Sequence, residues 1–379
     1  MALLKAQQAN GHDVVLYLKE PPETFANLGF PVRAVRDEAE LYAHAQRDRV
    51  DCLHLHENVD SLPTAWLPLV LTAHVPHFVC LSATLFFKTS QQPCPHVYSP
   101  ARCVWNHAVE RCGSVRPQRL AAEFGRLRNE RRTLTHIEVV VPSSRYRNLF
   151  LRSRFPEDRL HLVPHFVDPA LSLLPALSAD AAPHFLFVGR LEPNKGLPWL
   201  LRAMTKIPAE VHLDVAGAGT FAAKYRQMAE TLGLASRVNF HGWIRQQAIA
   251  ELARRSLALV VPSLWHETFG LVAIEMQARG RTVIASAVGG LEDIVENEVT
   301  GFLVQPGDIE GLAAAMRRMI FESGLVQKMG INGAKRMHEK FSLPLHLQAL
   351  DHVYWRAAER NTAEPHSVDP VAPASSPAS

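Results

Sequence analysis

The sequence has few cysteines and none of the spacings that make cysteine a structural residue. It holds 5 cysteines in 379 residues, an odd number without a C-x-x-C pair. Secreted domains that depend on disulfides carry more cysteines, usually in even numbers. This scarcity excludes a disulfide scaffold and predicts a protein of a reducing compartment.

Long apolar segments are also absent. No run approaches the ~18–20 residues that a membrane-spanning helix needs, and the opening M-A-L-L-K-A-Q-Q-A-N lacks the pattern of a signal peptide. With 47% hydrophobic and 20% charged residues, the composition is globular and excludes a disordered or fibrous chain. We therefore expect a soluble cytoplasmic protein.

The chain lacks a strong excess of one charge, since its formal net charge is +3. Locally the balance differs, because residues 111–154 contain eleven arginines and three acids. A solvated helix surface explains any one of these arginines, whereas their density fits a face that meets anionic lipid or a phosphorylated acceptor. No recognition motif for nucleic acid accompanies the charge. We expect no nucleic acid partner, and an anionic surface at the inner membrane face is a candidate partner.

The length exceeds one ordinary core and predicts two domains. We place a first domain at residues 1–172, an Ala/Pro/Ser-rich linker at 173–183 and a second domain at 184–341. A closing helix is expected at 342–360. The tail 361–379, rich in Pro, Ala and Ser, is expected to be disordered.

Short apolar runs alternate with helical patterns in both halves, which predicts an α/β fold with parallel sheets. In the first half the expected strands are residues 13–18, 51–56, 68–73 and 137–142. In the second half they are residues 184–188, 210–216, 237–241, 256–261 and 281–285. The chain opens in a helical pattern, so we expect the first sheet to lack its first strand.

Residues 185–196 read F-L-F-V-G-R-L-E-P-N-K-G, a buried strand that ends at Gly189. Arg190 and Lys195 follow in the loop beyond its carboxyl end, where parallel sheets bind their ligands. Two cations beside a glycine suit a diphosphate, because each can make charge-assisted hydrogen bonds to phosphate oxygens. A solvated basic loop is the alternative interpretation.

Residues 215–222, V-A-G-A-G-T-F-A, fit the dinucleotide-binding fingerprint that follows a strand. That fingerprint also needs an acid at the end of the next strand, which here reads N-F-H-G. A nicotinamide enzyme is therefore disfavoured. The simpler interpretation is that Gly217 lets a nucleotide approach the backbone closely.

Residues 262–275 read P-S-L-W-H-E-T-F-G-L-V-A-I-E, in which Glu267 and Glu275 bracket seven residues. Glu267 should lie in the loop ahead of a helix over 271–279, and Glu275 about one turn inside that helix. The amides of residues 269–271 would face outward at the helix N-terminus, where anions bind.

The order of these motifs resembles the retaining glycosyltransferases of family 4. It runs V-G-R-L-(x)3-K-G, V-A-G-A-G, P-S-(x)3-E-T-F-G-L-V-(x)2-E, G-G-(x)3-I-V and G-F-L-V-(x)2-G-D. The resemblance covers residues 185–341 closely and the first half loosely. It implies the GT-B fold, two Rossmann-like domains that face a cleft, with a C-terminal helix that crosses back to the first domain. It further implies a nucleotide-sugar donor as substrate, with no cofactor and no metal.

The resemblance assigns roles to single residues. Those that would bind the donor are Gly189, Arg190, Lys195, Gly217, Phe269, Gly270, Leu271 and Glu275. Among them Arg190 and Lys195 would hold the diphosphate, and Glu275 would bind the ribose hydroxyls. Glu267 and His74 would contact the transferred sugar as the catalytic pair. Trp243 or Ile244 would line the pocket of the base.

The chain departs from the family pattern at three places. It enters at the helix that follows the family's first strand and glycine-rich loop. The segment Pro164-His165-Phe166 stands where the family usually has P-N-G. Four cysteines, Cys80, Cys94, Cys103 and Cys112, are separated by gaps of 13, 8 and 8 residues. Zinc is conceivable there, but structural zinc usually uses a C-x2–4-C pair, so we expect no metal.

Taken together, the sequence predicts a retaining, metal-independent glycosyltransferase of polysaccharide or glycolipid biosynthesis. It would move a sugar from a nucleoside-diphosphate sugar to a glycan, a lipid-linked acceptor or a small molecule. The missing loop leaves a non-catalytic donor-binding or scaffold protein as an alternative. A sugar-nucleotide epimerase of the same fold is another, although it should lack the two spaced glutamates.

Overall fold

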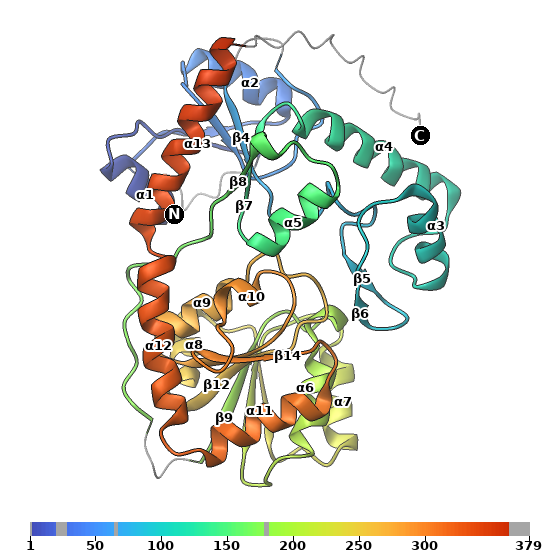
Figure 1. Cartoon of the computed structure of the whole chain (residues 1–379), viewed down its shortest axis with the longest axis vertical. Helices are drawn as coiled ribbons and strands as arrows, with labels where there is room; N and C mark the ends of the chain where they lie inside the picture. The colour runs from blue at the N-terminus through green and yellow to red at the C-terminus, as the bar shows by residue number, and fades with distance from the viewer. Residues whose placement is uncertain (1, 20–28, 64–66, 178–181, 364–379) are drawn as a thin grey trace.

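The computed structural model describes residues 2–19, 29–63, 67–177 and 182–363. Each half of the chain builds its own parallel sheet with helices around it (Figure 1). The predicted α/β fold with two parallel-sheet domains is therefore confirmed.

The second domain is a six-stranded, fully parallel sheet in the order β11-β10-β9-β12-β13-β14. Its strands are β9 (His184–Val188), β10 (His212–Ala216), β11 (Val238–Gly242), β12 (Ser256–Val261), β13 (Thr282–Ser286) and β14 (Gly301–Val304). This is the doubly wound order, in which the chain reverses its direction of travel across the sheet between β9 and β12. Ligands of such sheets bind at the carboxyl ends of the strands beside that reversal point.

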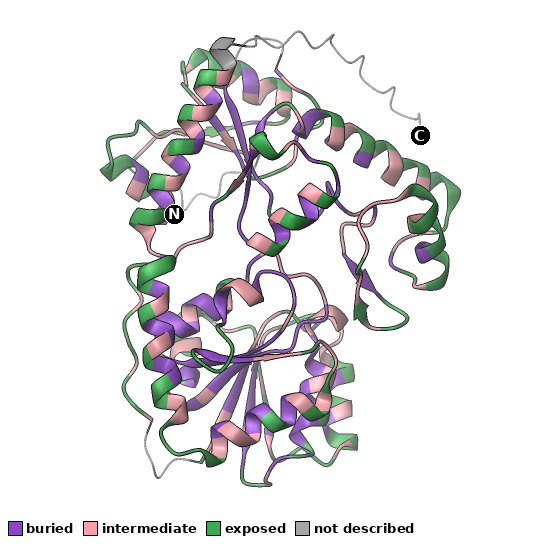
Figure 2. Cartoon of the chain, viewed as in Figure 1, coloured by how far each residue is buried: buried purple, intermediate pink, exposed green. Residues whose placement is uncertain are grey.

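Each strand predicted in this domain is present, with its ends within two residues of the prediction. Runs such as S-L-A-L-V-V in β12 are buried on both faces, because helices cover both sides of the sheet (Figure 2). Those helices are α6 (Leu197–Met204), α7 (Ala222–Thr231), α8 (Gln246–Arg255), α9 (Leu271–Ala278), α10 (Leu291–Ile294), α11 (Ile309–Phe321) and α12 (Leu325–Lys340). β14 was not predicted as a strand.

The first domain contains a parallel sheet in the order β3-β4-β7-β8 and a separate parallel pair, β1-β2. The strands are β1 (Leu16–Leu18), β2 (Val32–Ala34), β3 (Leu53–Leu55), β4 (Leu69–Thr72), β7 (Glu138–Val141) and β8 (Leu160–Leu162). The helices packed around them are α1 (Ala2–Ala9), α2 (Glu38–Arg47) and α5 (Ser144–Arg152).

The prediction of a buried strand over residues 13–18 was wrong in extent and in burial. β1 covers three residues, all half-buried, and pairs with β2 rather than with the four-stranded sheet. β2 and β8 were not predicted, because a three-residue strand is too short to show a periodic pattern.

A long excursion separates β4 from β7. It contains the short antiparallel pair β5 (Phe86–Phe87) and β6 (Gln92–Pro93), followed by α3 (Pro100–Val109) and α4 (Pro117–Leu134). Figure 1 shows these elements projecting to one side of the first sheet, and Figure 2 shows much of α3 and α4 exposed.

Helix α13 (Leu343–Ala363) follows α12 and crosses back to the first domain, as the resemblance implies (Figure 1). Its Leu350, Val353 and Ala357 pack in one apolar cluster with Val70 of β4 and Val140 of β7. The helix runs three residues into the segment predicted as a disordered tail. The remaining tail, 364–379, and residues 178–181 of the predicted linker lie outside the described residues.

The two domains are also joined by polar contacts at the start of α5. Ser143 Oγ donates a hydrogen bond to the Thr268 carbonyl of the second domain, at 2.7 Å. The backbone amide and the hydroxyl of Ser144 both donate to the Asp293 carboxylate. These contacts fix the loop before α9 from the side of the first domain. No described helix is long and apolar enough to cross a membrane.

Candidate active site

The loops after β9 and β12 place an ion pair at the reversal point of the second sheet. Lys195 ends a 3-10 turn (Pro193–Lys195) after β9, and its Nζ lies 2.6 Å from Oε1 of Glu267 in the loop after β12. Ser263 Oγ donates to the same oxygen, also at 2.6 Å. Nζ further lies 5.1 Å from the ring centre of Trp265, within the range of a cation–π contact. The structure thus brings two predicted site residues into direct contact.

Backbone-to-backbone packing sets the position of these loops. Gly196 has a φ of +73°, and a Cβ on it would lie 1.8 Å from the Pro262 carbonyl oxygen. Gly217 has a φ of +151°, and a Cβ there would lie 1.8 Å from the Gly189 carbonyl oxygen. No side chain fits at either place. The two glycines therefore let the loops after β9, β10 and β12 meet at one edge of the sheet.

The start of α9 offers free backbone donors beside the ion pair. Gly270 occupies the N-cap position with a φ of 128° and supplies no side-chain cap. Within the described chain, the amides of Phe269, Gly270 and Leu271 donate no hydrogen bond to another protein group. Phe269 itself is buried at 2% exposure, whereas Leu271 is exposed. An uncapped helix N-terminus of this kind favours an anion.

Glu275 lies within α9 and is half-buried. Burial raises the pKa of its carboxyl, the Asp168 carboxylate raises it further, and the Arg279 guanidinium opposes both effects. No hydrogen bond joins its side chain to another described residue, so the carboxylate is available to a ligand.

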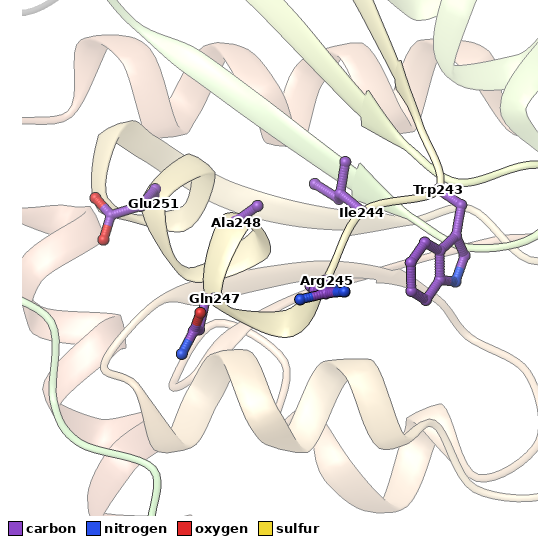
Figure 3. A pocket seen from close by; sticks show the side chains of 6 residues that line it. All are labelled: Trp243, Ile244, Arg245, Gln247, Ala248 and Glu251. Carbon is purple, nitrogen blue, oxygen red and sulfur yellow. The ribbon is translucent and has the colours of Figure 1, made fainter.

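Two of the predicted assignments are not brought to the ion pair. Arg190 is exposed, and its side chain forms no hydrogen bond or ion pair with another described residue. Trp243 and Ile244 line a surface hollow of about 660 Å³ together with Arg245, Gln247, Ala248 and Glu251 (Figure 3). The hollow lies beyond β11 at the start of α8, and none of the other predicted donor residues lines it.

In the first domain, His74 follows β4 and is exposed to solvent. The burial of part of its side chain lowers its pKa. Its Nε2 lies 2.9 Å from Nδ1 of His56, the residue after β3. Its other neighbour is His165, whose ring lies edge-on to Phe269 of the second domain at 5.2 Å. Neither neighbour was predicted as a site residue. His56 could have been found, because it follows a parallel strand just as His74 does.

The four clustered cysteines are unbridged. Burial raises the pKa of the thiols of Cys94, Cys103 and Cys112, as expected of inert structural cysteines. Across the described ranges, no three His, Cys, Asp or Glu side chains are arranged to hold a metal ion.

Comparison with known proteins gives this geometry a family context. Residues 176–336 match the family described as Glycosyl transferases group 1. The matched residues include most of the second domain.

Curated relatives align over the same half of the chain. An uncharacterized glycosyltransferase of Methanocaldococcus jannaschii is 36% identical over 160 residues, which is 41% of this chain and 40% of the relative. A D-inositol 3-phosphate glycosyltransferase of Streptomyces griseus is 39% identical over 161 residues, 39% of this chain and 34% of the relative. The chain therefore covers less than half the length of these two relatives.

Solved structures match the whole architecture. Sucrose-phosphate synthase from Thermosynechococcus elongatus has a TM-score of 0.69 and 24% identity, covering 94% of this chain and 92% of its own. Anabaena HepE in complex with UDP and glucose has a TM-score of 0.67 and 18% identity, covering 93% and 94%. At such identities the likeness concerns the fold, which is GT-B, with two Rossmann-like domains.

The close approach of the loops gives a direct test. Gly217→Ala should destabilise the protein by about 3 kcal/mol or more, because the new Cβ collides with the Gly189 carbonyl. Gly233→Ala is the matched control: it shares a positive φ but meets nothing within 4 Å, so it should cost roughly 1–2 kcal/mol. Chemical denaturation measures both. Equal losses of unfolding free energy in the two variants would show that the loops can move apart without an energetic penalty.

Proposed function

We propose that this protein is a retaining glycosyltransferase of family 4 that transfers a sugar from a nucleoside-diphosphate sugar. The observation that carries the proposal is the Lys195–Glu267 pair at the reversal point of the second sheet, beside the uncapped start of α9. The group 1 match of this domain and the names of its relatives support it. The acceptor would be a glycan, a lipid-linked molecule or a small molecule.

The donor diphosphate would lie between the loop after β9 and the start of α9. Lys195 would reach it from its present place beside Glu267, and the exposed Arg190 has a free guanidinium to close over it. Negative charge grows on the diphosphate as the C1–O bond breaks. Fixed cations and helix amides stabilise that charge without a metal ion. HepE structures hold UDP or UDP-glucose, so uridine donors are the first to test.

The transferred sugar would be held by Glu267 and His74. Lys195 and Ser263 both bind Oε1 of Glu267, and within the described chain no hydrogen bond reaches its Oε2. That oxygen can accept sugar hydroxyls, with the carboxylate plane already fixed. We assign no residue as a nucleophile. The acceptor oxygen would attack on the face that the diphosphate leaves, and a donor phosphate oxygen would take its proton.

The diphosphate assignment predicts a loss of catalysis. Lys195→Ala and Arg190→Ala should each lower kcat/KM by about 2–4 kcal/mol of transition-state stabilisation, with the fold intact. Lys328→Ala, an exposed lysine on α12, is the control and should change nothing. The measurement is turnover with a panel of UDP-, GDP- and ADP-linked sugars. Wild-type turnover in both variants would show that these two cations do not bind the diphosphate.

The same donor panel tests the alternative functions. If no donor is turned over, a binding protein is favoured, and a donor inverted at C2 as the product would identify an epimerase.

The two glutamates should separate binding from transfer. Glu275→Ala should mainly weaken UDP binding, because the ribose contact is the same in ground and transition states. Glu267→Ala should leave UDP binding nearly unchanged while transfer falls steeply, since the sugar changes geometry during reaction. Calorimetry with UDP and transfer assays measure the two effects.

The raised pKa of Glu275 adds a pH dependence to the same prediction. The carboxyl is protonated at pH values where an ordinary glutamate is ionised, so UDP affinity should fall as the pH drops through that raised pKa. Glu275→Gln should remove this dependence. Loss of UDP binding in Glu267→Ala but not in Glu275→Ala would reverse the assignments.

We also propose that the excursion between β4 and β7 meets an anionic membrane surface. Helix α3 turns apolar side chains outward: Trp105 is 68% exposed, and Val109 one turn later is 46% exposed. Exposed arginines lie on α3, at the start of α4 and in the segment between these helices, namely Arg102, Arg111, Arg116 and Arg119. Exposed Trp and Val beside arginines fit the interfacial region of an anionic bilayer. The site would then act at the inner membrane face on a lipid-linked acceptor.

Vesicle sedimentation tests this surface. The protein should pellet with vesicles of mixed phosphatidylglycerol and phosphatidylcholine at low salt, and less as salt rises. Trp105→Ala should weaken pelleting, whereas Trp355→Ala should not. Trp355 is 71% exposed, but it belongs to α13, which lies on the opposite side of the first domain from α3 (Figure 1). Protein that stays in the supernatant at low salt would disprove membrane binding.

A further inference from the structure

A column of aromatic rings runs from the closing helix to the start of α9. His54 and His56 stack with ring centres 4.5 Å apart, and His56 and His74 lie side by side with centres 5.2 Å apart. His165 follows at 5.7 Å from His74, and Phe269 completes the column edge-on. These residues come from β3, from the ends of β3 and β4, from the segment after β8 and from the second domain. Four histidines of the first half are thus aligned toward the proposed donor site.

Within this column His74 is clamped between two histidines: His56 lies at one edge of its ring, bound to Nε2, and the ring of His165 lies nearly parallel to it. The ring planes of His56 and His74 differ by 20°, and those of His74 and His165 by 8°, so all three rings are nearly parallel. Such geometry leaves the ring of His74 little freedom to rotate out of its plane. The donor-site loop lies next in the column, since His165 contacts Phe269 directly.

One hydrogen bond also determines which ring nitrogen of His74 remains available to a ligand. Its Nε2 is paired with Nδ1 of His56 at 2.9 Å, and one proton must lie between the two nitrogens. Protonating both rings there would place two cations in contact, and burial together with His74 lowers the pKa of His56 to about 4. Two neutral rings in a fixed hydrogen bond leave Nδ1 of His74 as the free atom.

The far ends of the column are anchored. His54 bonds to Thr72 through Nε2 at 2.7 Å and to the hydroxyl of Tyr354 on α13 through Nδ1 at 2.8 Å. The segment of His165 is held by α13 as well, because His346 Nδ1 donates to the Pro164 carbonyl at 2.7 Å. Neither end can shift without disturbing the closing helix.

We propose that His56 and His165 are positioning residues, which fix the ring plane of His74 and leave its Nδ1 available to the donor sugar. The proposal rests on the proposed function, since His74 has a task to be positioned for only if a sugar is transferred. It gives a role to His165, which replaces a turn residue of the family pattern. It also explains why these polar rings stack at the domain junction.

The roles of the His56 hydrogen bond and of the His165 ring can be tested separately. His56→Phe keeps an aromatic ring at this place and removes the hydrogen bond, so kcat should fall about 10- to 100-fold while UDP affinity stays within about twofold. His165→Ala removes one side of the clamp and should lower kcat about tenfold, whereas His165→Phe should keep it within about twofold. His352→Phe, an exposed histidine on α13, is the control.

Histidine ¹⁵N NMR gives a readout that needs no turnover. The Nε2 signal of His74, assigned by comparison with His74→Gln, should be that of a hydrogen-bonded nitrogen in the wild type and should shift in His56→Phe, which removes the partner. If the His74 signals are the same in His56→Phe and in the control, the proposal is wrong. If no donor turns over but the Nε2 signal shifts in His56→Phe, the proposed function fails while the clamp stands. Equal kcat in His56→Phe, His165→Ala and the control would also overturn the positioning role.

Discussion

The site depends on the contact of backbone with backbone at one edge of the second sheet. Where Gly217 meets the Gly189 carbonyl and Gly196 meets the Pro262 carbonyl, there is no room for a single carbon atom. Because the loops after β9 and β12 touch in this way, Lys195 and Glu267 face each other at 2.6 Å. Interiors of this density transmit displacement rather than absorb it. A change in either loop should therefore reach both charged groups.

The same loop is held by the first domain, and this joins the two halves of the proposed site. Thr268 accepts from Ser143, and Phe269 lies against His165, so the residues beside Glu267 contact both the start of α5 and the segment after β8. Helix α13 links the same parts through Tyr354 and His346. A sugar bound between Glu267 and His74 would thus be held by groups whose spacing depends on domain contacts.

Regular patterns in the second domain made most of its structure predictable. Strands β9 and β12 contain continuous apolar runs of four and five residues, and the motifs that follow them lie at the sheet edge because carboxyl ends of parallel strands meet there. The first domain was harder to predict, because strands of three residues, such as β1 and β8, carry too little periodicity. Pairing of β1 with β2 depends on neighbours distant in sequence.

By itself, the sequence determined the α/β fold and the order of the motifs. It also placed Lys195 and Glu267 in loops and Glu275 inside a helix, since these places follow from strand ends and local spacing. Tertiary structure alone decided which groups touch. It paired Lys195 with Glu267, left Arg190 exposed and placed Trp243 at a separate hollow. It also aligned His56, His74 and His165, which belong to three segments of the first half. The physical reason is that contacts between distant segments arise from packing and domain closure, which leave no periodic trace in the chain.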